Sequence, residues 1–147
     1  MNATSLSPAA PPRLRVLLLD DDAFMLDVLA DMLSDLGQFE VVSAAHAAPA
    51  LAALARHRPH LLICDLSMQD MDGIEFLRLA AEAGFGGGVV LLSGLHSAVR
   101  MAAGRLAEAH GLRILGAFKK PLEQADLLRM VALQQQTEAD ALASAPA

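Results

Sequence analysis

The sequence predicts an α/β fold, a doubly wound parallel sheet built from five strand–helix units. Short apolar runs alternate along the chain with segments whose apolar residues recur at helical spacing, the pattern of such a sheet. The runs are apolar throughout, which indicates strands buried on both faces. The chain has 147 residues, of which 54% are hydrophobic and 19% charged, so we expect one domain with a packed core.

The first two units lie in the first half of the sequence. The apolar run Val16–Leu19 predicts a strand. Apolar residues at helical spacing then predict a helix over residues 24–36, and Gly37 is a suitable residue to end it. Val41 and Val42 begin a second strand, and the Ala/Leu-rich residues 49–57 predict a short helix.

The other three units follow the same alternation. Residues 61–65 form the third expected strand, and the next helix, over residues 73–83, is expected to bury Ile74, Leu77 and Ala81 before a glycine-rich break. The last expected strands are residues 89–92 and 114–118, and the last expected helices are residues 98–110 and 122–136. We expect a disordered leader over residues 1–13, one domain over residues 14–136, and a tail or the start of a linker over residues 137–147.

Composition excludes several classes of function. The net charge is −6 and no Lys/Arg run is longer than Lys119-Lys120, so we expect no nucleic-acid surface on this domain. No apolar run approaches the length of a membrane span, and no membrane association is expected. The single cysteine, Cys64, cannot form an internal disulfide, which fits a reducing cytoplasm.

Polar side chains stand where the expected strands end. The first strand ends at Asp20 and Asp21, the third at Asp65, the fourth at Ser93 and the fifth at Lys120. In a parallel sheet these ends lie along one edge, where open α/β sheets bind ligands. Carboxylates so close together repel one another, and a divalent cation such as Mg²⁺ relieves that repulsion. Acids, a hydroxyl and an ammonium together suit phosphoryl transfer onto an aspartate.

Four motifs in this order, LLLDDD, ICDLSMQDMDG, LLSG and FKKP, resemble the receiver domain of two-component response regulators. The resemblance implies a flavodoxin-like fold with sheet order 2-1-3-4-5. It also implies that Asp65 accepts a phosphoryl group from a sensor histidine kinase or a phosphotransfer protein. It leaves open a homodimer and a C-terminal output domain beyond these residues. The long stretch from Ser93 to Lys120 further resembles receivers joined to cyclic-di-GMP phosphodiesterase (EAL) domains.

The resemblance also assigns roles within the site. Asp21, Asp65 and the backbone carbonyl of Ser67 would bind Mg²⁺ directly, with Asp20 acting through water. The phosphoryl group would contact Ser93 and Lys120, and Lys120 would precede a cis peptide bond to Pro121. The sequence departs from the family at Gln69, where proline is usual, and at Ala117, where many receivers carry an aromatic switch residue.

Other interpretations remain open from the residues alone. Asp22, Asp70 and Asp72 suit helix caps and turns better than metal binding, and the five histidines lack zinc spacing. A haloacid-dehalogenase-like phosphatase would use Asp20 and Asp22, but would leave Asp65 without a role. A degenerate receiver serving as a scaffold would not need the complete set of site residues.

Overall fold

The computed structural model describes residues 14–37, 39–66, 73–94 and 97–143. Five parallel strands form one sheet in the order β2-β1-β3-β4-β5, which confirms the predicted fold class and strand order. Their bounds are β1 (Leu14–Leu19), β2 (Phe39–Ala44), β3 (Leu61–Asp65), β4 (Gly88–Ser93) and β5 (Arg113–Lys119). The strands are longer than the apolar runs alone predicted, except β3, because backbone pairing extends to flanking polar residues.

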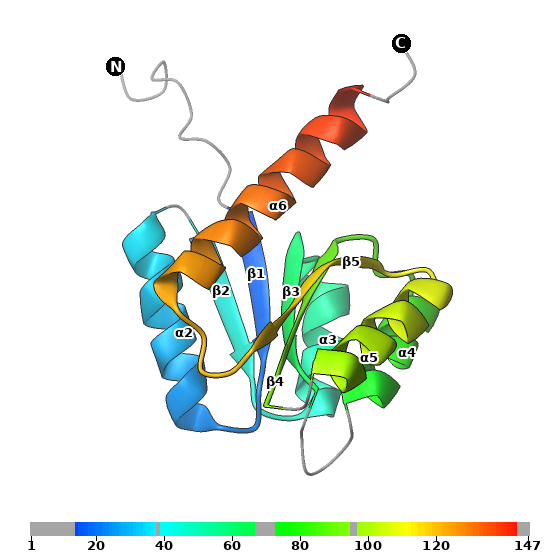
Figure 1. The fold of residues 1–147 in the computed structure, drawn as a ribbon, viewed down its shortest axis with the longest axis horizontal. Coiled ribbons are helices and arrows are strands. Elements are labelled where there is room, and N and C mark those ends of the chain that lie inside the picture. Colours follow the sequence, from blue (N-terminus) through cyan, green and yellow to red (C-terminus); the bar gives the residue numbers. More distant parts are fainter. Residues whose placement is uncertain (1–13, 38, 67–72, 95–96, 144–147) are drawn as a thin grey trace.

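Helices cover both faces of the sheet, α2 and α6 on one and α3, α4 and α5 on the other (Figure 1). Their bounds are α2 (Ala23–Leu36), α3 (Ala47–His57), α4 (Gly73–Glu82), α5 (Ser97–Ala109) and α6 (Gln124–Ala143). Helix α6 was expected to end near Gln136, but it continues to Ala143 and projects past the sheet (Figure 1). Within the described ranges no helix combines the length and apolar character that a membrane crossing needs.

The core has two halves, separated by the sheet. Leu17 and Leu19 of β1 pack toward α3, α4 and α5, whereas Val16 and Leu18 pack toward α2 and α6. Successive strand residues point to opposite faces, so an unbroken apolar run fills both halves. Strands β1, β3 and β4 are buried in this way, while the edge strands β2 and β5 are only partly buried.

Helix α4 buries Leu77 and packs Ala81 against the core as predicted, but it leaves the third predicted residue exposed. Ile74 was expected in the core but is 37% exposed, and the buried residues are Gly73, Phe76, Leu77 and Ala80. Gly73 sets this orientation, because a Cβ there would lie 2.5 Å from the Cα of Leu66. The glycine side of the helix therefore rests on the end of β3, and Ile74 turns away.

Some expectations fall on residues outside the described ranges. These are the leader of residues 1–13, the carbonyl of Ser67, the departure at Gln69 and the turn residues Asp70 and Asp72. The peptide bond between Lys120 and Pro121 is cis, as predicted.

Candidate functional site

Three aspartates meet where β1 and β3 end. Asp20 follows the last residue of β1, and Asp65 is the last residue of β3, which lies beside β1 in the sheet. Carboxylate oxygens of Asp20, Asp21 and Asp65 all lie within 4.8 Å of one another. Asp20 and Asp65 are buried and Asp21 is exposed, so the cluster opens to solvent on one side. The structure thus brings together the acids that the sequence placed at one edge.

Lys120 reaches this cluster from the end of β5. Its Nζ lies 2.7 Å from Oδ2 of Asp20 and 3.3 Å from Oδ2 of Asp65. Burial by itself lowers the pKa of Lys120, but the hydrogen bond to Asp20 and the charges of Asp20 and Asp65 outweigh burial, so the pKa lies above its ordinary value. The lysine is therefore an ammonium that binds two carboxylates at once.

Ser93 lies between the aspartates and the lysine in the order of the strands. It ends β4 and is fully buried. The backbone N–H of Lys120 donates to the Ser93 carbonyl at 3.0 Å, which joins the ends of β4 and β5. All five described residues of the predicted site therefore stand at one edge of the sheet.

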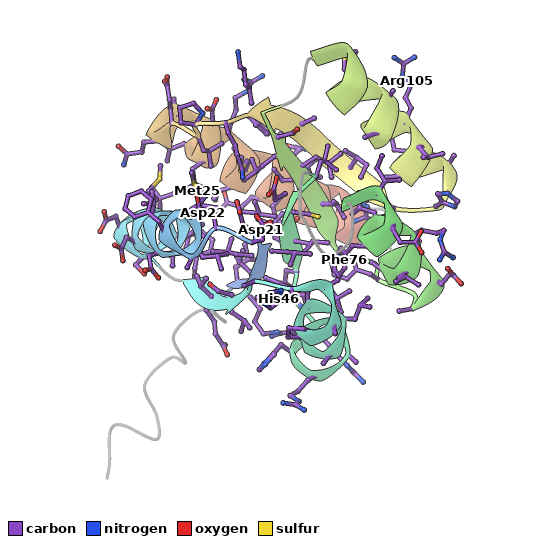
Figure 2. The ribbon with its side chains drawn as sticks, turned by 90° about the horizontal axis from the view of Figure 1, so that it is seen from below. Asp21, Asp22, Met25, His46, Phe76 and Arg105 are labelled. Carbon is purple, nitrogen blue, oxygen red and sulfur yellow. The ribbon has the colours of Figure 1, made fainter. Side chains whose placement is uncertain are left out.

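The acidic run separates into residues with different contacts. Oδ1 of Asp22 accepts hydrogen bonds from the backbone N–H groups of Phe24 and Met25, which makes Asp22 the N-cap of α2, as expected. Oδ1 of Asp20 accepts from the Asp22 backbone N–H at 2.9 Å, which helps to orient that carboxylate. Figure 2 looks onto this edge and shows Asp21 and Asp22 where the chain enters α2.

Two residues beside Asp65 matter in ways that the sequence did not reveal. A Cβ on Gly73 would lie 2.7 Å from the Asp65 carbonyl oxygen, so only glycine lets α4 begin so close to the acid. Cys64 precedes Asp65, and burial, reinforced by the charges of Asp65 and Asp20, raises the pKa of its thiol far above the ordinary range. The thiol stays protonated and is no nucleophile.

The end of β5 carries no aromatic side chain on the α5 side. Ala117 packs against the core half shared with α3, α4 and α5, and Phe118 packs against the other half. The guanidinium of Arg129 in α6 lies 5.9 Å from the centroid of the Phe118 ring. The two residues face opposite ways, as strand geometry predicted.

The donor set fits a hard divalent cation. It consists of carboxylate oxygens gathered around one spot, and such oxygens are the ligands that Mg²⁺ prefers while keeping several waters. Three carboxylates against one ammonium leave excess negative charge, which a cation would neutralise. A buried carboxylate at a strand end, an acidic cluster suited to a cation and a lysine therefore lie together at one edge of the sheet, an arrangement that suits phosphoryl transfer.

Comparisons with known proteins agree with this geometry. Residues 16–132 match the model of the family described as the response regulator receiver domain. A cyclic di-GMP phosphodiesterase, RocR of Pseudomonas aeruginosa, is 35% identical over 109 residues, which are 74% of this chain and 28% of that protein. The chain thus spans less than a third of that relative's length.

Two solved structures share the fold. A CheY-like response regulator receiver domain protein from Methanospirillum hungatei is 27% identical with a TM-score of 0.72, over 86% of this chain and 98% of that one. A signal receiver domain of a LuxO repressor protein from Vibrio parahaemolyticus has a TM-score of 0.76 at 19% identity, over 91% of this chain and 99% of that one. The second likeness concerns the fold alone.

Proposed function

We propose that Asp65 is the residue of this chain that accepts the phosphoryl group. The chain belongs to the response regulator receiver domain family and is a phosphoacceptor signalling module. One observation carries the proposal. Asp65 is the buried carboxylate at the end of a central strand, and Lys120, Asp20 and Asp21 lie around it. Asp20 is also buried beside Lys120, but both of its carboxylate oxygens are already bound, Oδ1 by the Asp22 backbone N–H and Oδ2 by Lys120.

The proposed reaction is an in-line displacement. A carboxylate oxygen of Asp65 attacks the phosphorus of a phosphohistidine, the new O–P bond forms, and the N–P bond breaks. The electron pair returns to the imidazole nitrogen, which takes up a proton. Mg²⁺, when bound, neutralises charge on the transferred group. The Lys120 ammonium supplies a second positive charge from the opposite side of the crevice.

The proposed metal ligands come from this chain. Asp21 and Asp65 would bind the ion directly and Asp20 would act through water, with the Ser67 carbonyl as the third protein ligand. The close approach of the three carboxylates supports this assignment. A partner then supplies the phosphoryl group, a sensor histidine kinase or a phosphotransfer protein, as receiver domains use in general.

Phosphorylation of Asp65 would change the contacts of Lys120. The lysine bridges Asp20 and Asp65 before phosphorylation, and a phosphoryl oxygen would compete for the same ammonium. We infer that the Ser93 hydroxyl turns toward the phosphoryl group and that the segment following β4 moves with it. Ala117 has no side chain that could change rotamer, so this switch runs without an aromatic residue on β5.

Acetyl phosphate with Mg²⁺ tests the acceptor. Intact mass spectrometry should show one added phosphoryl group, and fragmentation should place it on Asp65. Asp65→Asn should abolish the addition, whereas the N-cap variant Asp22→Asn should retain it. Phosphate found on Asp20 would favour the phosphatase alternative, and no phosphate at all would favour a scaffold.

A second measurement tests the switch. Amide exchange is compared with and without a beryllofluoride mimic of the phosphoryl group. Ser93→Ala and Lys120→Ala should each remove the response, and Lys119→Ala should retain it, because Lys119 is exposed and points away from the site. An unchanged response in Ser93→Ala and Lys120→Ala would contradict the proposed route.

The output is proposed by analogy alone. The Pseudomonas relative carries its receiver-like segment in a longer chain named as a cyclic di-GMP phosphodiesterase. We propose that this receiver likewise controls an output partner or domain. The reading frame around residues 1–147 tests this, because it shows whether an output domain is encoded with the receiver.

A further inference from the structure

A cavity lies at the amino edge of the sheet, the edge opposite Asp65. Its volume is about 440 Å³, and it opens between the end of α3 and the turn that joins α4 to β4. Pockets that hold small molecules fall in this range of volume. The lining residues with side chains or backbone groups suited to a ligand are Leu51, Leu54, Arg58, Phe85, Gly86 and Gly87.

One wall of the cavity is apolar. Leu51 and Leu54 lie three residues apart on α3, so they share a helix face, and Phe85 approaches from the turn after α4. Leu51 and Phe85 are only partly buried although they pack against the core. A flat apolar group placed here would remove their exposed area from water, which favours binding.

Arg58, the cationic residue that lines this cavity, has an unusual backbone conformation. Arg58 has φ +46°, the left-handed region, directly after α3, where glycine is the usual residue. Among the described residues, it is the one residue other than glycine with a positive φ. Within the described ranges no carboxylate pairs with its guanidinium. An arginine without a carboxylate partner among the described residues therefore stands where the backbone would suit glycine better.

The glycine turn adds hydrogen-bond donors. No described residue accepts a hydrogen bond from the backbone N–H of Gly86 or Gly87. The turn is held in place beside them, because the Gly88 N–H donates to the His60 carbonyl at 2.9 Å. Gly87 must lack a side chain, since a Cβ would lie 2.6 Å from that same carbonyl oxygen. Backbone N–H groups and a guanidinium that line the same cavity favour an anionic ligand.

We propose that this cavity binds a small amphipathic carboxylate, with its apolar body against Leu51, Leu54 and Phe85 and its carboxylate at Arg58. The one guanidinium that lines the cavity matches a single negative charge, and the apolar wall matches a ligand that is mostly hydrocarbon. The site is independent of the proposed phosphorylation, because the Asp65 cluster lies at the other edge of the sheet.

Amide shifts measured by NMR on the isotopically labelled 147-residue chain test the proposal, with naphthalene-2-carboxylate as the probe. Its addition should shift the amide signals of Gly86 and Gly87. Arg58→Gly should weaken binding about tenfold, roughly the loss of one charge-assisted hydrogen bond, and should keep the fold, because the left-handed backbone suits glycine. Arg56→Gln, a nearby exposed arginine that does not line the cavity, should bind like the wild type.

Two further arms use the same readout. Ala55→Trp should block binding, because Ala55 lies on the cavity wall and is exposed. Asp65→Asn should bind like the wild type, which separates this site from the phosphorylation site. Equal binding of neutral 2-naphthalenemethanol or of inorganic phosphate would overturn the proposal, and so would unchanged affinity in Arg58→Gly or the absence of any shift at millimolar probe.

Discussion

The two edges of the sheet place their charged side chains in different surroundings: like charges are crowded at one edge, and a cation binds backbone carbonyls at the other. At the carboxyl edge, Asp20, Asp21 and Asp65 crowd around one lysine. At the amino edge, the Arg15 side chain donates through Nε to the His57 carbonyl at 2.8 Å and through Nη2 to the Arg58 carbonyl at 3.1 Å. These carbonyls belong to the end of α3, where acceptors lack partners within the helix.

This difference indicates that the amino edge contributes stability, whereas the carboxyl edge carries the groups suited to chemistry. The Arg15 contact satisfies carbonyls that the helix leaves open, so it should stabilise the native state. The acid cluster leaves like charges close together, so it should destabilise the native state until a cation binds. Removal of a charged side chain should therefore lower stability at the amino edge and raise it in the acid cluster.

The largest effects are expected at glycines, where the backbone approaches closely at both edges. Gly73→Ala and Gly87→Ala should each lower the free energy of unfolding by about 3 kcal/mol, because the added Cβ meets backbone atoms at 2.5 and 2.6 Å. Gly86→Ala is the control, since a Cβ there meets nothing within 4 Å. Urea unfolding measures all three. Equal stability of Gly73→Ala and Gly86→Ala would contradict the packing assigned to α4.

Arg15→Ala should have the next largest effect. Loss of the contacts to the His57 and Arg58 carbonyls should lower the free energy of unfolding by about 2 kcal/mol, because the carbonyls lose charge-assisted hydrogen bonds. Arg56→Ala is the matched control, as its exposed side chain lies on the same helix end. If both variants lose the same stability, the cap is not what stabilises this edge.

Asp21→Asn should act in the opposite direction. Without metal, the substitution should raise the free energy of unfolding by about 1 kcal/mol, because one of the crowded charges is removed. Addition of Mg²⁺ should stabilise the wild type, by about 2.7 kcal/mol at 100 times its dissociation constant, and should stabilise the variant much less. Asp22→Asn, which keeps a good N-cap, should respond like the wild type. The same Mg²⁺ response in Asp21→Asn would remove Asp21 from the metal site.

The smallest expected effect is a dependence of stability on alkaline pH. The pKa of Lys120 is raised in the folded state, so its contribution is complete below the ordinary value of 10.5 and is lost as pH rises through the folded value. The Cys64 thiol changes stability in the same direction above its ordinary value of 9.0, because only the unfolded chain can ionise it readily.

Urea unfolding between pH 8 and 11.5 measures this loss. The stability of Lys120→Met should fall less steeply than that of the wild type near the upper end of this range. The stability of Cys64→Ala should fall less steeply than that of the wild type from about pH 9 upward. If the stability of both variants falls as steeply as that of the wild type, neither group is responsible.

Much of the site could be predicted because its signals are local. Val16–Leu19 is apolar and Asp20 follows at once, so both the buried strand and the acid at its end are visible in adjacent residues. The same holds for Asp65 and Ser93, which end their strands, and for the Asp22 cap. Given parallel strands, geometry alone places these ends at one edge.

Other features of the fold and the site depend on contacts between elements that are distant in the sequence. Nothing local says that Ile74 is exposed, because two faces of that helix carry apolar residues; the approach of Gly73 to the backbone of Leu66 chose between them. The bridge from Lys120 to Asp20 joins residues 100 positions apart, and the distances within it depend on how β5 is placed in the sheet.

The sequence by itself therefore determined the alternation of strands and helices and the residues at the strand ends, since burial and spacing are properties of neighbouring residues. Only the tertiary structure decided the face that α4 buries, the pairing of Lys120 and the support of α3 by Arg15. It also created the cavity beside Arg58, whose walls come from segments more than 20 residues apart. Each of these depends on distances between elements, and packing sets such distances only after the sheet has formed.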